Sequence, residues 1–363
     1  MSEVFYQNEI NRLKAENEQL NEKVTQLDSA IKDTYAMING LVGMIKANTN
    51  LADTYSGIIN SQQCYINQVD MITRNIKYEI CDLVGADTFF KPKLRSNDET
   101  LRMIIDEKKS LARFGDGEFS IAGNIIRQKF QRLDDRLALR IKEVLVSNNE
   151  NLLVAVADNY GSLEKYNENS ADAIRFYMNE DTRRLHESLL DKEKVYSDAY
   201  ITRPYVMYKD NFTDAPKKRF DRIKQIWRGK KIVIVEGSQT RLGIGNDLFA
   251  EAKSIRRILA PPTSSFDRYD DILKASLESA DSADIFILAI GPSSGVLAYD
   301  LTLQGIQAVD VGHVDMEYEW FLAGKGERVP VPGKYNNELD GGDEVEAVND
   351  EEYISQIIVD LSK

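Results

Sequence analysis

The first fifty residues carry a heptad pattern, in which apolar residues recur at two positions of each seven-residue repeat. The first position is mostly β-branched and the second is mostly leucine, which favours a parallel two-stranded coiled coil. Asn17 occupies one first-position slot and would fix the register and the number of strands. We therefore predict that residues 1–50 form a coiled-coil stalk that makes the protein a homodimer, the alternative being a helix folded onto its own domain. The first register holds Ile10, Asn17, Val24, Ile31, Ile38 and Ile45, and the second holds Leu13, Leu20, Leu27, Thr34, Leu41 and Asn48.

Residues 51–95 continue with apolar residues at three- and four-residue spacings, which predicts helices that link the stalk to a catalytic domain. A break is expected at Gly85 and at Lys91-Pro92-Lys93. The next segment begins with Ser96, a candidate helix N-cap, before the amphipathic stretch TLRMIIDEKK. We place the start of the catalytic domain here, over residues 96–363.

After residue 96 short apolar runs alternate with helical segments, and each run ends in a polar or glycine-rich turn. Continuous apolar runs of this kind are typical of parallel strands buried on both faces. We therefore predict an α/β fold with a Rossmann-like, mostly parallel sheet, in which ligands bind beyond the carboxyl ends of the strands. The runs are Leu111–Phe114, Leu152–Ala157, Ile232–Val235, Ile255–Leu259, Ile285–Ile290 and Ala308–Val311.

Composition narrows the class of protein. The chain has 363 residues, 42% of them hydrophobic, and a formal net charge of −13, which argues against a nucleic-acid partner. No apolar run is long enough for a transmembrane segment, and the N-terminus lacks the pattern of a secretory signal. Two cysteines, Cys64 and Cys81, are expected to be reduced thiols, so we expect a cytoplasmic protein.

The first turn with candidate chemistry is RFGDGEF, residues 113–119, after a predicted strand. Asp116 and Glu118 flank one glycine and follow Gly115, so both carboxylates could bind one hard cation such as Mg²⁺ or Mn²⁺. Arg113 could add bidentate contacts to a phosphate. A solvated acidic turn is the alternative interpretation, and the motif alone is a weak signal.

The second turn, EGSQTRLGIGND, follows the strand KKIVIV and spans residues 236–247. Glycines at a strand-to-helix turn let backbone N–H groups approach a phosphate, so nucleotide contact is expected here, although helix capping by Asn246 would also explain the pattern. It is neither a dinucleotide fingerprint, because Leu248 replaces the third glycine, nor a P-loop. The candidate nucleotide-sugar contacts in this turn are Glu236, Gly237, Thr240, Arg241, Gly243, Gly245, Asn246 and Asp247.

Two further turns could complete a site. Gly291, Ser293 and Ser294 lie in GPSSG, where hydroxyls and a helix N-terminus suit a phosphate or a ribose, although simple N-capping is equally consistent. The segment DVGHVDMEYEW places His313 between acids, a cluster that could deprotonate an acceptor hydroxyl or could simply begin a helix. The other histidine, His186, lies in a polar helical run and is expected at the surface.

Taken together and in order, these blocks resemble the GT-D glycosyltransferases, a family first catalogued as a domain of unknown function. The resemblance covers residues 96–338, about two-thirds of the chain. Two departures are Ser238-Gln239, where many relatives carry a charged residue, and GPSSG, which replaces a threonine-rich turn. The matching blocks are RFGDGEF, SDAYITRPY, IWRGKKIVIVEGSQTRLGIGNDLF, SIRRILAPPTSSFDRYDDIL, GPSSGVLAYDL, GIQAVDVGHVDMEYEW and PGKYNNE.

The resemblance implies transfer of a hexose from a nucleotide sugar, typically a UDP-hexose such as UDP-glucose, to a saccharide or glycoprotein glycan in bacterial surface-glycan synthesis. It implies Mn²⁺ or Mg²⁺ at Asp116 and Glu118. We further expect Arg113, Arg203 and Arg241 to share the charge of the diphosphate. If the reaction inverts the anomeric centre, Asp315 is the first candidate for the base and Glu317 the second. A non-catalytic coiled-coil scaffold with a nucleotide-binding α/β domain is the alternative function.

Overall fold

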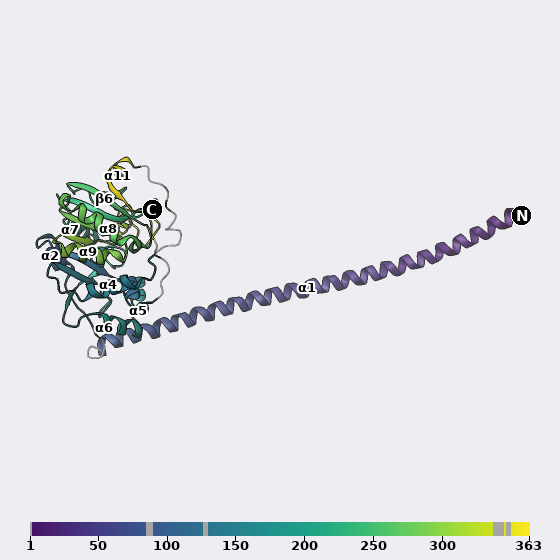
Figure 1. Ribbon diagram of the computed structural model, residues 1–363. Coiled ribbons are helices and arrows are strands. Elements are labelled where there is room, and N and C mark those ends of the chain that lie inside the picture. Colours follow the sequence, from purple (N-terminus) through teal and green to yellow (C-terminus); the bar gives the residue numbers. More distant parts are fainter. Residues whose placement is uncertain (1, 85–89, 126–129, 337–344, 346–349) are drawn as a thin grey trace. The chain divides into compact units, whose positions relative to one another are not determined.

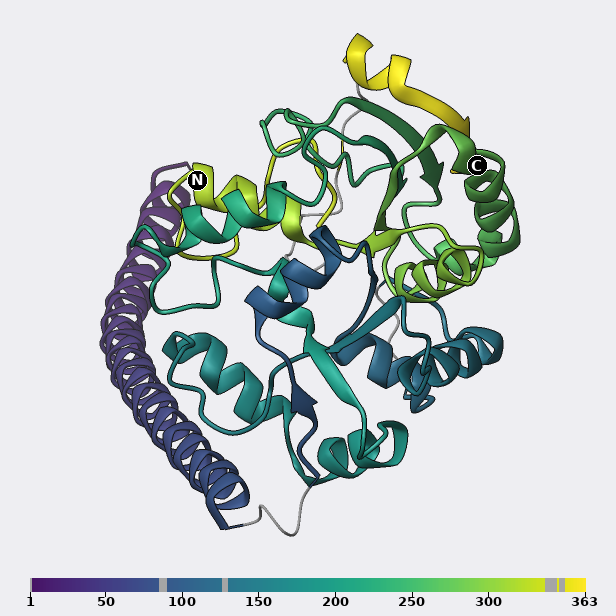
Figure 2. The same cartoon turned by 90° about the vertical axis from the view of Figure 1, so that its left-hand side faces the viewer.

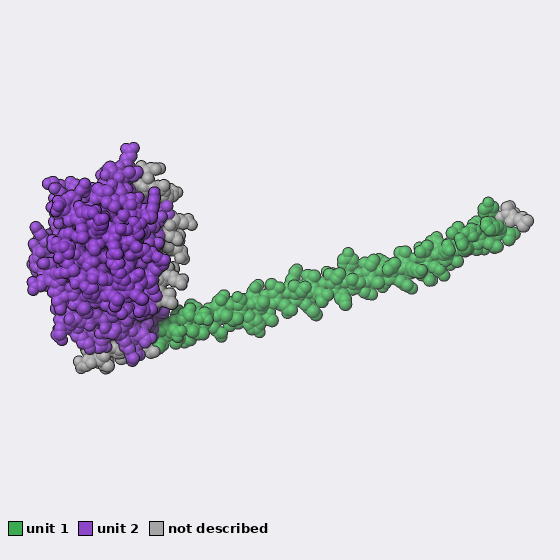
Figure 3. Space-filling model, viewed as in Figure 1, with its two compact units in different colours: residues 1–73 green, residues 74–363 purple. Residues whose placement is uncertain are grey.

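The structure is a computed structural model that describes residues 2–84, 90–125, 130–336, 345 and 350–363. The chain divides into two compact units, residues 1–73 and residues 74–363, which Figure 3 shows in green and purple.

The first unit consists of most of one helix, α1, which runs without interruption from Ser2 to Val84 (Figure 1). No proline occurs before residue 92, which permits this length. The expectation of several helices after residue 50 is therefore wrong, since one helix continues through that stretch, and the break expected at Gly85 lies outside the described residues. In the first unit the large apolar side chains of this helix are solvent-exposed in the single chain, with Leu27 62% and Ile31 52% exposed.

The second unit is built on a sheet of nine parallel strands in the order β1-β4-β3-β2-β8-β7-β5-β6-β9. The predicted α/β fold with a mostly parallel sheet is confirmed, and all six predicted strands are present. Three short strands, β1, β4 and β9, were not predicted; β9 lies in the yellow C-terminal segment at the sheet edge in Figure 2. The strands are β1 Lys93–Leu94, β2 Ser110–Phe114, β3 Leu152–Val156, β4 Val195–Asp198, β5 Lys231–Gly237, β6 Ser254–Ala260, β7 Ile285–Ala289, β8 Ala308–Asp310 and β9 Ile357–Asp360.

Helices cover both faces of this sheet because alternate strand residues point to opposite sides. Val233 and Val235 of β5 pack with α3, α4, α8 and α9, whereas Ile232 and Ile234 pack with α2, α7 and α10. Ser96 caps α2 by accepting a hydrogen bond from the Glu99 amide, as the sequence predicts. The helices are α2 Asn97–Ile105, α3 Asp116–Ala122, α4 Asp135–Leu145, α5 Glu168–Tyr177, α6 Glu180–Leu189, α7 Ala215–Lys224, α8 Tyr269–Glu278, α9 Ser293–Leu303, α10 Val314–Leu322 and α11 Glu351–Gln356, with short 3₁₀ turns η1 Ala199–Thr202, η2 Ser265–Arg268 and η3 Ala280–Ser282. None of the helices in the described part of the chain has the length and apolar character of a membrane span.

The expectation that His186 lies at the surface is wrong. His186, on α6, is only 3% exposed, and its ring stacks on Phe119 with 3.8 Å between ring centroids. Its Nδ1 bonds to the hydroxyl of Tyr160 and its Nε2 to the hydroxyl of Tyr177. Burial, with a smaller contribution from the positive charge of Arg183, lowers the pKa of His186 to about 3.

Because all strands are parallel, their carboxyl ends lie at one edge of the sheet, and the turns that follow β2, β5, β7 and β8 begin there. The chain runs from β5 to its neighbour β6 on one side and from β7 to its neighbour β8 on the other. Connections that diverge between adjacent strands open a crevice at the edge of a parallel sheet, which is where such folds bind ligands. The fold therefore brings the four predicted turns to one place.

Candidate active site

Direct contacts join the predicted turns at this edge. Arg113 at the end of β2 donates from Nε to the backbone oxygen of Asp310 at 3.1 Å and from Nη2 to its carboxylate at 3.1 Å. Arg113 Nη1 donates to the backbone oxygen of Ala199, which begins η1, at 3.2 Å. The GPSSG turn also reaches β2, since a Cβ on Gly295 would lie 3.0 Å from the Phe114 ring. One arginine therefore ties β2, β8 and η1 together.

The two acids of the RFGDGEF turn are in different environments. Asp116, the first residue of α3, is exposed, whereas Glu118 folds back so that its Oε2 accepts a hydrogen bond from the Gly115 amide at 2.7 Å. Burial raises the pKa of Glu118, the Gly115 hydrogen bond lowers it, and the negative charges of Asp116 and Asp310 raise it further. The two carboxylates of this motif are thus close enough to repel each other, and a divalent cation would relieve that repulsion.

The residues around Asp116 and Glu118 fit a cation that keeps part of its shell for other ligands. Across the described residues, no group of three or more His, Cys, Asp and Glu side chains converges as a closed metal site. Mg²⁺ and Mn²⁺ sites are commonly completed by substrate phosphates and water, with one or two carboxylates from the protein. The arrangement therefore suits a cation that binds together with a diphosphate.

The glycine-rich segment after β5 does not lead into a helix, contrary to expectation. Residues 238–253 form successive turns up to β6, so no helix N-terminus is present here to attract a phosphate. Glu236 is fully buried and pairs with Arg257 at 2.5 Å, and its second oxygen accepts the amide of Leu242 at 2.7 Å. This carboxylate therefore holds the segment after β5 in place through the Leu242 amide and has a structural role.

Several expected phosphate donors in this segment are engaged within the protein. The Gly243 amide donates to Asp315 Oδ1 at 2.9 Å, and the Asn246 side chain donates to the same oxygen at 2.8 Å. Gly243 has φ of +75°, and a Cβ there would lie 2.5 Å from the Phe249 ring, so glycine is required at this position. Asp247 pairs with Lys224 at 3.0 Å.

Three further candidate residues of this segment are Thr240, Arg241 and Gly245. Arg241 has φ of +53°, and its Nη1 donates to the backbone oxygen of Gly333 at 2.6 Å. Thr240 turns back so that its amide donates to the Gly237 carbonyl at 2.8 Å. At Gly245 no atom would lie within 4 Å of an added Cβ, so space is open beside its backbone.

The turn after β7 is closely packed against other parts of the domain. Gly291 has φ of +61°, and a Cβ there would collide with the Phe130 ring. Ser293 and Ser294 begin α9 and are both buried. The hydroxyl of Ser293 accepts from that of Ser265 at 3.0 Å, and the hydroxyl of Ser294 accepts from the Ile290 amide at 2.8 Å. These contacts give both hydroxyls a structural role.

The three candidate catalytic residues also differ in their surroundings. His313 is partly exposed at the N-cap of α10, and its Nδ1 lies 3.2 Å from Nη2 of Arg203. Glu317 is buried, and its Oε2 accepts the amides of Tyr205 at 3.0 Å and Val206 at 2.9 Å. Burial raises the pKa of Glu317, while the positive charge of Arg203 lowers it.

Asp315 is buried with both of its oxygens bonded. Oδ1 accepts from Gly243 and Asn246, and Oδ2 pairs with Lys334 at 2.6 Å. Lys334 is 5% exposed and also pairs with Glu319 at 2.7 Å. The sequence alone does not indicate this role for Lys334. The residue lies in the PGKYNNE block, 19 residues after the carboxylate that it contacts, and no local pattern connects the two.

These features define a class of α/β protein that binds its ligand beyond the carboxyl edge of a parallel sheet, with a carboxylate pair at the first turn. The chain belongs to the Glycosyltransferase GT-D fold family, whose family model matches residues 111–339. Membership confirms the resemblance seen in the sequence.

Two curated relatives are similar to this chain. One is the "Probable glycosyl transferase Gly" of Streptococcus gordonii, 35% identical over 271 residues, which are 74% of this chain and 39% of the relative. The other is "Glycosyltransferase GlyD" of Streptococcus pneumoniae, 33% identical over 76% of this chain and 34% of the relative. The chain therefore spans little more than a third of the length of these relatives.

Solved structures agree in fold. One, described as a new glycosyltransferase (DUF1792) from Streptococcus sanguinis, superimposes with a TM-score of 0.68 and 31% identity, covering 75% of this chain and 100% of that chain. Another, described as having a distinct glycosyltransferase fold, gives a TM-score of 0.68 and 32% identity over 74% of this chain and 96% of that chain. The similarity covers the parallel-sheet domain at an identity that supports membership of the family.

Proposed function

We propose that this protein is a glycosyltransferase that moves a hexose from a nucleotide-sugar donor, UDP-glucose or a similar UDP-hexose, to a saccharide or glycoprotein glycan acceptor in bacterial surface-glycan synthesis. The observation that supports this most is the exposed Asp116 beside Glu118 at the carboxyl edge of the sheet, in a chain of the GT-D fold family. Both relatives with curated names are called glycosyltransferases.

Asp116 and Glu118 would hold the proposed Mn²⁺ or Mg²⁺. When bound, the cation would neutralise charge on the diphosphate that leaves the sugar. Glu118 keeps its position through the Gly115 amide, and Asp116 is exposed at the start of α3. The chain thus presents one anchored and one accessible carboxylate.

Positive charge for the diphosphate is proposed to come from Arg203 and Arg241 rather than from Arg113. All three arginines have partners within the protein, but Arg113 uses each of its three guanidinium nitrogens in the contacts to Asp310 and Ala199. We assign Arg113 to positioning, since it fixes the strand ends on which the other groups stand.

His313 is proposed to donate a hydrogen bond to the bound donor. An arginine can only donate, so the contact from Arg203 requires Nδ1 of His313 to be the acceptor. The proton of a neutral ring then lies on Nε2. In this state Nε2 can donate to a sugar or phosphate oxygen, whereas it cannot remove a proton from an acceptor hydroxyl.

We propose positioning roles for Asp315 and Glu317 in place of the base role expected from the sequence. Asp315 holds Gly243 and Asn246 in the segment after β5, and Glu317 holds the two amides that follow η1. Neither carboxylate is solvent-exposed, because each side chain is buried against the backbone that it orders.

The stalk is proposed to form a parallel homodimer. The same heptad register can be followed beyond residue 50, with Ile59 and Ile66 at the first position and Val69 and Ile76 at the second, although Gln62 and Thr73 each occupy one slot. All four side chains are exposed in the single chain. A continuous helix that keeps apolar residues in one heptad register is what a two-stranded coiled coil requires, so the dimer interface is expected to extend beyond the first fifty residues.

The function is tested with Asp116→Asn and Glu118→Gln in the full chain. Release of UDP from UDP-glucose and other UDP-hexoses is measured with Mn²⁺ and with EDTA. We expect the activity to need the cation and each variant to lose roughly a hundredfold or more, since stabilisation of the leaving group is a large part of such catalysis. Asp135→Asn and Glu150→Gln, at exposed acids without an assigned role, are the matched controls.

Two outcomes would contradict the proposal. Undiminished turnover in both Asp116→Asn and Glu118→Gln would remove the metal assignment. A wild-type protein that turns over no donor in the panel, and whose melting temperature does not respond to UDP with Mn²⁺, would favour the non-catalytic coiled-coil scaffold.

A further inference from the structure

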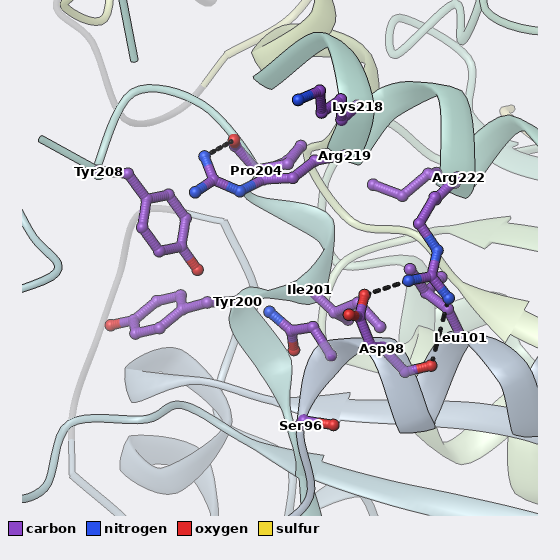
Figure 4. A pocket seen from close by; sticks show the side chains of 12 residues that line it. Ser96, Asp98, Leu101, Tyr200, Ile201, Pro204, Tyr208, Lys218, Arg219 and Arg222 are labelled. Carbon is purple, nitrogen blue, oxygen red and sulfur yellow. Dashed lines mark hydrogen bonds and ion pairs between the residues drawn. The ribbon is translucent and has the colours of Figure 1, made fainter. Parts of the chain in front are cut away.

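A separate pocket of about 460 Å³ opens between the start of α2, the segment from η1 to Tyr208, and α7 (Figure 4). This volume is in the range of small-ligand sites. None of its lining residues belongs to the predicted metal or nucleotide set. The domain therefore carries a pocket that the proposed donor contacts do not account for.

A buried acceptor without a partner lines this pocket. The side-chain oxygen Oδ1 of Asn97, in the first turn of α2, is inaccessible to solvent and has no hydrogen-bond partner among the described residues. Leaving a buried carbonyl oxygen unpaired is unfavourable, and such groups in native proteins usually have a reason. A ligand that donates a hydrogen bond, such as a hydroxyl, would satisfy this oxygen once the Asn97 side chain turns it towards the pocket.

The walls combine flat apolar surface with fixed polar groups. Figure 4 shows Tyr200 and Tyr208 at one end of the pocket and the Asp98–Arg222 ion pair at the other. Ile201 contributes an aliphatic wall beside them. A pyranose ring has the matching properties, since its C–H face packs on apolar and aromatic side chains while its hydroxyls both donate and accept hydrogen bonds.

Charge in the pocket argues for a neutral polyol over an anion. Arg219 is paired with Asp210 at 2.6 Å and stacks over Tyr208 at 4.4 Å, and Arg222 is paired with Asp98. Two of the three cations that line the pocket are therefore paired with carboxylates, whereas the third, Lys218, is exposed to solvent, and the acidic side chain of Asp98 lies in the pocket wall. Alternating donors and acceptors of this kind fit hydroxyl groups.

The pocket is linked to the candidate active site through Tyr200. Burial raises the pKa of this tyrosine, and the charges of Arg203, Asp198 and Asp116 all act on its hydroxyl. Tyr200 lines the pocket, and it follows Ala199, whose backbone oxygen accepts a hydrogen bond from Arg113 of the RFGDGEF turn at 3.2 Å. The same segment continues to Arg203, which contacts His313.

We infer that this pocket binds a saccharide, with Asn97 Oδ1 accepting a hydroxyl proton and the Asp98–Arg222 pair orienting neighbouring hydroxyls. Its identity as the acceptor saccharide rests on the proposed function. Binding of the sugar here would place the acceptor chain beside Tyr200, on the way to the donor site.

Binding is tested first, independently of catalysis. Saturation-transfer NMR of the full chain is recorded with the methyl glycosides of glucose, galactose, mannose and N-acetylglucosamine at millimolar concentration. We expect transfer to at least one glycoside, weakened about tenfold or more in Asn97→Leu, which removes the acceptor at similar volume, and retained in Asn97→Asp, which keeps it. Arg222→Ala provides a second loss variant, and Arg228→Ala, at the exposed pair with Glu251, is its matched control.

The kinetic arm asks whether the saccharide is the acceptor. Glycosides that bind are supplied as acceptors, and we expect Asn97→Leu to raise the acceptor KM about tenfold while donor hydrolysis in the absence of acceptor stays unchanged. Equal binding by wild type and Asn97→Leu, or no binding of any glycoside to the wild type, overturns the inference. Glycoside binding that depends on Asn97 in a protein without donor turnover would keep the saccharide site and refute the proposed function.

Discussion

Replacement of His186 by glutamine should flatten the dependence of stability on acid pH. The imidazole is enclosed by Phe119, Tyr160 and Tyr177, and its two nitrogens bond to the two tyrosine hydroxyls. A neutral ring has one donor and one acceptor nitrogen, so it satisfies both hydroxyls, whereas a protonated ring would carry an unpaired buried charge. Glutamine keeps one donor and one acceptor and does not titrate.

The size of the effect follows from the shift in pKa. Burial lowers the pKa of His186 from 6.5 to about 3, so the folded protein binds this proton less readily than the unfolded chain does. The stabilisation is therefore fully present above pH 6.5 and is lost progressively as the pH falls towards 3. Between pH 6.5 and pH 5 the loss is about 1.4 kcal/mol per pH unit, or about 2 kcal/mol in all.

The assay is urea denaturation of wild type and His186→Gln at intervals from pH 7.5 to pH 5. Other buried groups titrate in this range, among them Asp198, whose pKa burial raises to about 6, so the measured quantity is the difference between the two proteins.

Parallel stability curves for wild type and His186→Gln would refute this account of the site. The same result would follow if the ring were solvated, as the polar sequence around it suggests. An NMR titration is a direct check, since the chain has only two histidines and the His186 resonances should not shift above pH 5.

Two further predictions concern the domain core and the stalk. Arg257→Met should lower the free energy of unfolding by about 3–5 kcal/mol, because it leaves the carboxylate of Glu236 buried and unpaired. In urea titrations, the double variant that also carries Glu236→Gln should recover part of that loss. Additive losses in the double variant would contradict the pairing. The double variant Ile31→Asp with Ile38→Asp should be a monomer by light scattering without loss of donor hydrolysis. The control Lys32→Asp, outside the apolar stripe, should stay dimeric. A double variant that remains dimeric would refute the coiled coil as the interface.

Much of the sheet could be predicted because its central strands are buried on both faces. Runs such as Ile232–Val235 and Ile285–Ile290 contain only apolar residues, a pattern that few other structures require. The missed strands β1 and β4 are short and partly polar, and they pair with each other in the register Lys93↔Val195. Their strand conformation depends on that pairing between distant segments, which local pattern does not encode.

The grouping of the candidate site could also be predicted, since parallel strands place their carboxyl ends together. The roles within the site could not. EGSQTRLGIGND has the composition of a phosphate-binding turn, yet the Gly243 amide that would serve a phosphate donates to Asp315. A glycine that is needed because Phe249 packs against it has the same letter in the sequence as a glycine that is needed to bind a ligand.

Asp116 and Asp315 show why residue type and spacing do not decide which acid is accessible for catalysis. Both are aspartates close to a glycine-containing turn after a strand, and both were candidates for chemistry. Asp116 is exposed, whereas Asp315 has one oxygen bonded to Gly243 and Asn246 and the other paired with Lys334. Because that lysine comes from a segment that no local pattern connects to the turn, availability for catalysis is decided by tertiary contacts. A base for an inverting transfer is therefore better sought among acids that remain accessible at the carboxyl edge.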